Sequence, residues 1–239
     1  TSGGPEDTSI RVYMSSINPM TDIPYEKVSS QEFGTLLEKV KKATFFFEDK
    51  NYLVLRIFVC QKRHTLLKIV HHTAYIHPLR EGHRFPMVKY ELIPAQLLYE
   101  GVVDKDNFFF FFLADFETCC LGHRKEYVQQ LFDLTLDAKM VRRIGFPLSQ
   151  SLVERERYIL DGTIQSTLYA MKYGISFNTA GGTHHAGYDY GEGFCLMNDQ
   201  AVAANYLLTN GHAKKILIID LDVHQGNGTA HVFLDNPKV

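Results

Sequence analysis

The sequence lacks a long apolar run, a paired-cysteine motif and an excess of charge of either sign. No run reaches the roughly 18 apolar residues of a membrane-spanning helix, so no membrane association is expected. The four cysteines include no C-x-x-C pair and no disulfide-framework spacing, which indicates a reducing compartment and thiols that mostly pack. The net charge of −2 gives no general attraction to nucleic acid, so no direct nucleic-acid binding is expected.

A signal peptide is not evident either, because residues 1–5 are small and polar. We therefore expect a cytoplasmic or nuclear protein. The chain has 239 residues, of which 45% are hydrophobic and 22% are charged, as is typical of a globular protein with one large domain or two small ones.

Two regions of the chain differ in character. Residues 1–66 show no chemical motif and begin with a stretch rich in Ser, Pro, Thr and Gly, which indicates an appended, partly flexible segment. Within it, periodicity predicts a helix over 31–42 and a strand over 52–59, and a partner-docking surface is the alternative. Residues 67–239 hold all of the polar motifs, so we expect the functional domain there.

From residue 67 onward, apolar patterning predicts an α/β chain. Strands are expected over 68–75, 175–179 and 216–219, and helices over 90–99, 126–136, 152–173 and 198–208. Strand, loop, helix and strand from 175 to 219 form a βαβ unit, so the loops that follow its two strands are expected to meet at one edge of a parallel sheet. Five consecutive Phe, residues 108–112, are expected to bury some of their rings, the alternative being an aggregation-prone stretch.

Three ionisable side chains follow the last predicted strand at alternate positions: Asp220, Asp222 and His224. Alternate residues of an extended chain share one face, so the three point the same way. A buried strand that ends in two carboxylates and an imidazole needs a partner for them, and zinc accepts both ligand types. The alternative is a strand end with a capping Asp and a solvated His.

The loop after the preceding strand carries two adjacent imidazoles, His184 and His185. Neighbouring side chains point apart on an extended chain, and Gly181 and Gly182 allow the bend that turns both toward one site. Two imidazoles near a metal ion suggest a general base and a general acid, and a zinc ion with three protein ligands keeps a position open for water. The pattern therefore indicates metal-assisted hydrolysis of an amide or ester. A pair of structural loop histidines is the alternative.

Three more positions have roles in this hypothesis. Asp220 need not be a ligand, and we expect it to accept a hydrogen bond from one imidazole and so to fix its tautomer. Gly193 and Phe194 suggest a narrow apolar wall that suits a linear aliphatic substituent, although core packing is the simpler reading of Phe194 taken alone.

Taken together, three segments resemble the zinc-dependent histone deacetylase family and occur in the family's order. They are residues 181–186, 191–195 and 220–228, which read Gly-Gly-Thr-His-His-Ala, Gly-Glu-Gly-Phe-Cys and Asp-Leu-Asp-Val-His-Gln-Gly-Asn-Gly. The form of residues 225–228 is similar to the class IV branch and to related bacterial deacetylases. The resemblance runs from about residue 74 to residue 233.

This resemblance implies the arginase/deacetylase α/β fold, in which three layers consist of a parallel sheet flanked by helices. It implies removal of acyl groups from the ε-amine of lysine, with Zn²⁺ as cofactor. Asp222 and His224 match zinc ligands, and together with Asp220 they match part of a structural potassium site. His184 and His185 match the tandem catalytic histidines, and Asp220 matches the carboxylate behind His184.

Further matches and departures concern the rest of the site. Gly193 and Phe194 match the acyl-lysine channel, and Arg84 matches an Arg beside the internal cavity for the released acid. Asn227 stands where many members have an Asp that supports the second histidine, and Tyr190 stands where class IV relatives usually have Arg. Family members continue past residue 239, and that continuation carries a third zinc ligand and a Tyr that stabilises the oxyanion. We therefore expect the N-terminal portion of a deacetylase, which by itself binds zinc weakly and is nearly inactive.

Two functions stay open. The first is a zinc-dependent deacylase that acts on acetylated lysine in histones or other proteins, on a longer acyl-lysine, or on a small acetylated molecule. The second is a catalytically incomplete metal-binding or interaction module. An arginase-like binuclear enzyme is disfavoured, since it needs more Asp and His ligands than this motif offers.

Overall fold

A computed structural model of the chain describes residues 10–14, 67–109 and 111–239. Contacts divide the chain into two units, one of Thr1–Ser16 with His64–Val239 and one of Ile17–Arg63. All described residues belong to the first unit. The predicted helix over 31–42 and the predicted strand over 52–59 lie outside the described residues, and the domain boundary at residue 66 stays a prediction.

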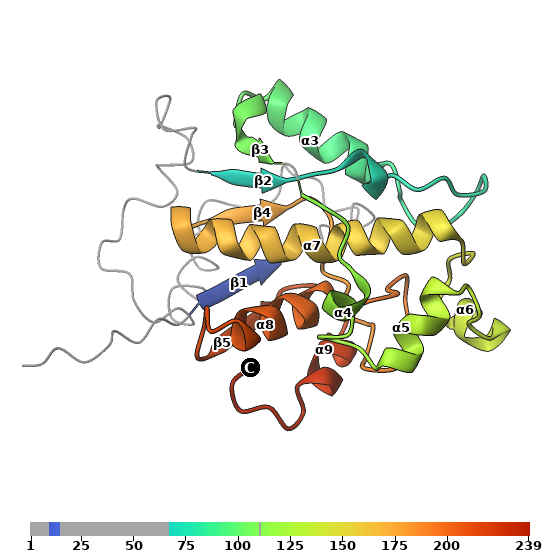
Figure 1. Cartoon of the computed structure of the whole chain (residues 1–239). Helices are drawn as coiled ribbons and strands as arrows, with labels where there is room; N and C mark the ends of the chain where they lie inside the picture. Colours follow the sequence, from blue (N-terminus) through green and yellow to red (C-terminus); the bar gives the residue numbers. More distant parts are fainter. Residues whose placement is uncertain (1–9, 15–66, 110) are drawn as a thin grey trace, which may run out of the picture. The chain divides into compact units, whose positions relative to one another are not determined.

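Every strand pairing in the described residues is parallel. β2 (Lys68–Val70) lies between β3 (Phe108–Phe109) and β4 (Ser176–Asn178), and β1 (Ile10–Met14) pairs with β5 (Ile216–Asp220) (Figure 1). Parallel strands need crossover connections, and helices supply them here. The fold is thus a parallel sheet flanked by helices, as predicted.

The two strands of the predicted βαβ unit, β4 and β5, do not pair with each other among the described residues. β5 bonds to β1 instead, with Ile10 opposite Ile216 and Met14 opposite Asp220. Residues 10–14 therefore form a strand inside the stretch that composition had suggested to be a flexible lead-in. Pairing between strands far apart in sequence leaves no local signal, which is why this partner was missed.

The four predicted helices are present as α3 (Lys89–Tyr99), α5 (Lys125–Phe132), α7 (Gln150–Tyr173) and α8 (Asp199–Thr209). Three short helices were not predicted, namely α4 (Phe116–Cys119), α6 (Ala138–Ile144) and α9 (Asn227–Val232). α5 ends four residues earlier than expected, since Leu134 adopts a φ of 57°. The strand expected over 68–75 ends at Val70, and Thr73–Tyr75 form a 3-10 turn. No helix in the described parts of the chain is both long and apolar enough to cross a membrane.

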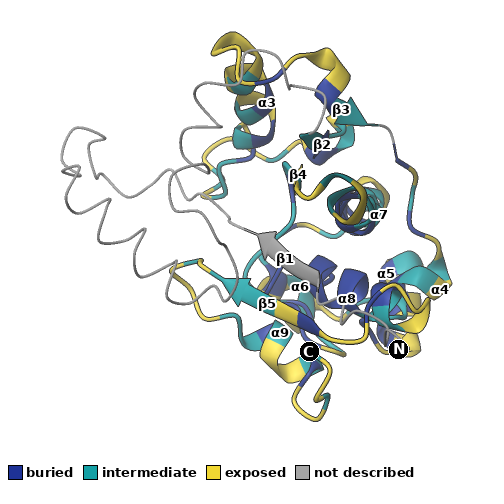
Figure 2. Cartoon of the chain, turned by 90° about the vertical axis from the view of Figure 1, so that its left-hand side faces the viewer, coloured by how far each residue is buried: buried dark blue, intermediate teal, exposed yellow. Residues whose placement is uncertain are grey.

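The long helix α7 packs against β2, β4 and α8 (Figure 1). Ser149 begins it as predicted, because its Oγ accepts a hydrogen bond from the backbone N–H of Leu152 at 3.3 Å. Gly174 ends it with a φ of 90°. Most of α8 is buried beside it (Figure 2). These two helices carry the side chains that support the site.

The Phe-rich segment divides between strand, core and surface. Phe108 and Phe109 form β3, while Phe111 is buried and its ring lies 5.8 Å from that of Tyr75. Phe112 is 80% exposed. The prediction that some of these rings are buried is therefore confirmed for Phe111.

Candidate functional site

The loop that follows β4 and the turn that follows β5 meet, although their strands are not paired. Nδ1–H of His184 donates a hydrogen bond to Oδ2 of Asp220 at 2.5 Å. The backbone N–H of Thr229 donates to the carbonyl oxygen of His184 at 3.0 Å. The ring of His184 is buried, and its centroid lies 4.3 Å from that of His185. The structure thus brings the two sequence motifs into one site.

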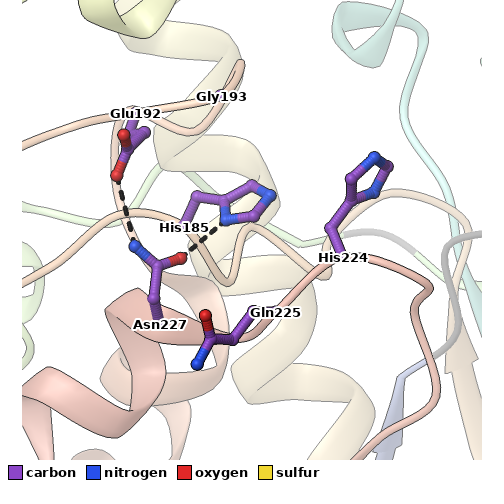
Figure 3. A pocket seen from close by; sticks show the side chains of 6 residues that line it. All are labelled: His185, Glu192, Gly193, His224, Gln225 and Asn227. Atoms are coloured by element: carbon purple, nitrogen blue, oxygen red, sulfur yellow. Dashed lines mark hydrogen bonds between the residues drawn. The ribbon is translucent and has the colours of Figure 1, made fainter.

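His185 is anchored by an amide rather than by a carboxylate. Its Nδ1 lies 2.7 Å from Oδ1 of Asn227, whose Nδ2 donates to Oε2 of Glu192 at 3.2 Å (Figure 3). The same Glu192 oxygen accepts a hydrogen bond from Arg143 at 2.9 Å. This hydrogen bond with Arg143 holds the pKa of the Glu192 carboxyl below its usual value. A continuous series of hydrogen bonds therefore runs from a guanidinium to an imidazole.

An open pocket of about 310 Å³ lies over this part of the site (Figure 3). It is lined by His185, Glu192, Gly193, His224, Gln225 and Asn227. The rings of His185 and His224 both line it, in an edge-to-face arrangement with centroids 5.9 Å apart (Figure 3). His184 is not among the lining residues, so His185 is the imidazole of the pair that can reach a molecule in the pocket.

Asp222 and His224 form a pair of potential metal ligands beside the pocket. Nδ1 of His224 lies 2.8 Å from Oδ1 of Asp222, and Nε2 of His184 lies 4.0 Å from the same oxygen. Carboxylate oxygen and imidazole nitrogen are both zinc donors, so the chemistry of this pair fits the ion. Within the described ranges, however, no group of three His, Cys, Asp or Glu side chains is arranged to hold a metal. The described residues thus offer fewer protein ligands than the three or four that zinc takes.

The histidine loop is held by a buried carboxylate at the start of α8. Oδ1 of Asp199 accepts hydrogen bonds from the backbone N–H and the hydroxyl of Thr183 at 2.8 and 2.6 Å. Its Oδ2 accepts from the hydroxyl of Thr163 on α7 at 2.7 Å. Because Thr183 directly precedes the two histidines, these bonds fix where the loop can place them.

Asn198 joins three parts of the site. Its Oδ1 accepts from the backbone N–H of Ala201 and so caps α8. Its Nδ2 donates to the carbonyl of Ala186 at 2.9 Å and to the hydroxyl of Thr229 on α9 at 3.0 Å. The histidine loop and the helix that follows the aspartate turn are therefore tied to the same side chain.

Two glycines allow the backbone to come this close. At Gly228 an added Cβ would lie 2.4 Å from the carbonyl oxygen of Ala186, so only glycine lets α9 approach the histidine loop. At Gly193 φ is 56°, and an added Cβ would lie 2.8 Å from Cδ2 of His185. Gly193 thus permits a left-handed turn directly against the imidazole.

Phe194 and Arg84 lie outside the lining of the pocket. The ring of Phe194 packs against those of Phe85 and Phe146, with centroids 5.1 and 5.0 Å away. The guanidinium of Arg84 lies 4.8 Å from the centroid of the Phe194 ring. Gly193 does line the pocket. The substrate-channel role of Gly193 and Phe194, the acid-cavity role of Arg84 and the potassium site stay predictions.

Sequence reasoning gave no role to Glu192, Arg143, Gln225 or Asp199. Glu192 lies within the motif of residues 191–195, between Gly191 and Gly193. A charged residue between two glycines of a motif is the signal that could have marked it as functional. Arg143 lies 49 positions from Glu192, in no motif, so nothing local marked it. Asp199 was seen only as part of a helix start.

Another buried imidazole, His123, supports the histidine loop through two hydrogen bonds to backbone atoms. Its Nδ1–H donates to the carbonyl of Gly187 at 2.9 Å, and its Nε2 accepts from the backbone N–H of Asn198 at 2.8 Å. Burial lowers its pKa to about 4, because the charged ring is poorly solvated there. His123 is therefore a neutral bridge between α8 and the chain that follows the histidine loop.

Comparison with known proteins places this geometry in a family context. The histone deacetylase domain family matches residues 35–239. An uncharacterized protein of Picosynechococcus sp. is 44% identical over 171 residues, which are 72% of this chain and 57% of that protein. The acetylpolyamine amidohydrolase of Mycoplana ramosa is 52% identical over 56 residues, 23% of this chain and 16% of that enzyme.

A solved structure is similar as well. The crystal structure of an HDAC homolog from Aquifex aeolicus superposes with a TM-score of 0.61 at 25% identity, over 72% of this chain and 49% of that one. The chain thus spans about half the length of the Picosynechococcus protein and of the Aquifex homolog.

Proposed function

The chain belongs to the histone deacetylase domain family, and we propose that the protein hydrolyses the amide bond of acylated amines, with acyl-lysine as the principal substrate class. One observation carries the proposal: His185 is anchored through Nδ1 and faces the pocket, while the adjacent His184 is buried against Asp220. Such a pair supplies one imidazole that can exchange a proton with a bound molecule and one that is held behind it.

In this proposal the two histidines have different roles. His185 moves the proton, because its ring lines the pocket and its Nδ1 is already taken by Asn227, which leaves Nε2 for the substrate. His184 supports the reacting atoms from inside, with its ring oriented by Asp220. Hydrogen bonds at both Nδ1 atoms hold the rings before a substrate arrives, which is the arrangement that acid–base catalysis requires.

Asp222 and His224 would hold Zn²⁺ in this proposal. A bound zinc ion supplies Lewis acidity, which polarises a carbonyl oxygen and makes water more acidic. His224 lines the same pocket as His185 and is hydrogen-bonded to Asp222, so an ion held there and the proton-transfer group would act on the same molecule.

The substrate could be a protein side chain or a small molecule. The name of the Mycoplana ramosa enzyme describes an amidohydrolase of acetylpolyamines, which are small acetylated amines. An acetyl-lysine side chain and an acetylated polyamine present the same amide on a linear aliphatic chain, so both belong to the proposed substrate class.

Hydrolysis tests this proposal directly. Release of acetate from an acetyl-lysine peptide and from N-acetylputrescine would be measured for the zinc-loaded whole protein, of which this chain is expected to be the N-terminal portion, and for its His185→Ala and His212→Ala variants. His212 is an exposed residue on the loop after α8, and its replacement is the control. We expect the wild type and His212→Ala to hydrolyse at least one substrate. His185→Ala should lose about 100-fold or more in rate. A zinc-loaded wild type that hydrolyses neither substrate contradicts the proposal.

A second candidate function is a non-catalytic metal-binding or interaction module. It is favoured by the finding that the described residues contain no group of three potential metal ligands. Zinc content after dialysis separates the two candidates: about one retained ion per chain, lost in Asp222→Ala, favours the enzyme, and no retained ion favours the module.

A further inference from the structure

The side chain that is hydrogen-bonded to Nδ1 of His185 is the amide of Asn227. An amide leaves the tautomer of the imidazole undetermined, whereas a carboxylate would determine it. A side-chain amide has a donor edge and an acceptor edge of nearly equal shape. Asn227 could therefore accept a hydrogen bond from Nδ1–H of His185, or it could turn over and donate to an unprotonated Nδ1. The first arrangement leaves the lone pair of the neutral ring on Nε2, and the second places the proton there.

Glu192 removes this ambiguity. An ionised carboxylate only accepts hydrogen bonds, so Asn227 must turn its NH₂ toward Oε2 of Glu192, which lies 3.2 Å away. Its oxygen then faces Nδ1 of His185 at 2.7 Å, and that nitrogen must be the donor. The state of the imidazole thus depends on a side chain that does not contact it through a hydrogen bond.

Arg143 keeps Glu192 in the form and place that this requires. Its guanidinium donates to Oε2 at 2.9 Å and lies 4.1 Å from the centroid of the Tyr190 ring. The backbone N–H of Gly193 donates to the carbonyl of Arg143 at 3.2 Å, so the segment that carries Glu192 is fixed to the end of α6. Both members of the ion pair are therefore positioned by neighbours and not by each other alone.

We propose that Glu192, held by Arg143, is a positioning residue that fixes the side-chain amide of Asn227 and thereby the tautomer of His185, with Nδ1 protonated and Nε2 as the acceptor. The meaning of this tautomer for catalysis rests on the proposed deacylase function, whereas the tautomer itself does not. The proposed roles of His184, His185, Asp222 and His224 do not involve Glu192, so its role is a separate inference.

Ring-nitrogen spectroscopy tests the proposal without any assay of activity. Long-range ¹H–¹⁵N spectra of His185, identified with His185→Ala, would be recorded at increasing alkaline pH until they no longer change. We expect a protonated Nδ1 and an unprotonated Nε2 in the wild type. In Glu192→Ala both nitrogens should shift toward a mixture of tautomers, because Asn227 is then free to turn over.

The conservative variant Glu192→Gln is the matched control. Its amide oxygen can still accept from both Arg143 and Asn227, so its spectrum should resemble that of the wild type. Glu126→Ala, on the exposed side of α5, should change nothing. A wild-type His185 protonated at Nε2, or an unchanged tautomer in Glu192→Ala, overturns the proposal.

The kinetic arm follows the same variants. Glu192→Ala should lower kcat by about 10- to 100-fold, as is usual for residues that orient an active-site imidazole, with KM changed by less than about twofold. Glu192→Gln should keep most of the rate. A loss of rate without a tautomer change would make Glu192 merely structural and sink the idea. A wild type that shows the expected tautomer but no hydrolysis would count against the proposed function alone.

Discussion

Oδ2 of Asp220, the last residue of β5, lies 2.5 Å from Nδ1 of His184, in the loop after β4, although the two residues are 36 positions apart and their strands are not paired within the described parts of the chain. A hydrogen bond to an ionised acceptor is short and about twice as strong as a neutral one. It joins the loop after β4 to the last residue of β5. The site therefore depends on this contact for its geometry as well as for its charge.

Replacing Asp220 with Asn tests the charge at nearly constant shape. Asp220→Asn should lower kcat/KM for an acetylated substrate by about 10- to 100-fold, because the amide still orients His184 but no longer provides a negative charge. Asp235→Asn, an exposed change of the same type, should be silent. Zinc content would be measured in parallel, and equal rates in the two variants would show that the Asp220 charge is not used.

A second pair of variants isolates the close contact at Gly193. Gly193→Ala and Gly211→Ala both place Ala at a positive φ, of 56° and 71°, so both should cost about 1–2 kcal/mol of stability. Only at Gly193 does the new Cβ meet the ring of His185, at 2.8 Å, while nothing lies within 4 Å at Gly211. Thermal unfolding should therefore show a loss of stability in both variants, with the larger loss in Gly193→Ala, and only Gly193→Ala should also lose activity. Full activity in Gly193→Ala would contradict the close contact.

The buried carboxylate of Asp199 should be sensitive to neutralisation. In Asp199→Asn one oxygen becomes an NH₂ group that faces hydrogen-bond donors, which should lower the free energy of unfolding by about 2–3 kcal/mol. Asp137→Asn is the control, because Asp137 caps the exposed helix α6 and Asn caps helices equally well. Urea unfolding of the three proteins measures the difference. A loss in Asp137→Asn as large as that in Asp199→Asn would refute a special role for the buried site.

The buried ring of His123 makes stability depend on pH. Its pKa is about 4 in the folded chain and about 6.5 when unfolded, so between these values the unfolded state binds more protons. The free energy of unfolding should therefore fall as the pH falls through this window, by about 2 kcal/mol between pH 7 and pH 5 from this residue.

The contribution of His123 is measured as the difference in the free energy of unfolding between the wild type and His123→Gln. Burial raises the pKa of Glu156 to about 7, which acts in the opposite direction over the same window, but Glu156 is present in both proteins of the comparison. The gap in the free energy of unfolding between the wild type and His123→Gln should thus shrink on acidification. The corresponding gap for His212→Gln, at an exposed site, should stay constant. A gap for His123→Gln that is independent of pH would be inconsistent with a buried neutral ring.

Features set by neighbouring residues could be predicted from the sequence. Ser149 and Gly174 bound α7 because capping depends on one side chain and one backbone angle, and both lie within a turn of the helix. The meeting of His184 with Asp220 also follows from local reasoning, since each motif directly follows a strand. The α/β class is recovered for the same reason.

What could not be predicted depends on partners distant in sequence. The pairing of β1 with β5 joins residues more than 200 positions apart and leaves no periodic signal of its own. The hydrogen bond between Arg143 and Glu192 likewise joins residues that are distant in sequence. From the sequence alone, each of these charged side chains could equally well be exposed to solvent without a partner. The early end of α5 turns on Leu134, whose left-handed φ is unusual for that residue type.

The crossover from His184 to Asp220 has a consequence for how the protein is made. Closing a loop of this length costs on the order of 3 kcal/mol in chain entropy, and doubling the length would add only about 0.6 kcal/mol. Asn198, near its middle, already bonds to the histidine loop and to α9. His184, His185 and their partners Asp220 and Asn227 therefore all lie within residues 184–227. The two histidines can therefore reach their hydrogen-bond partners as soon as the chain has been synthesised to the end of α9.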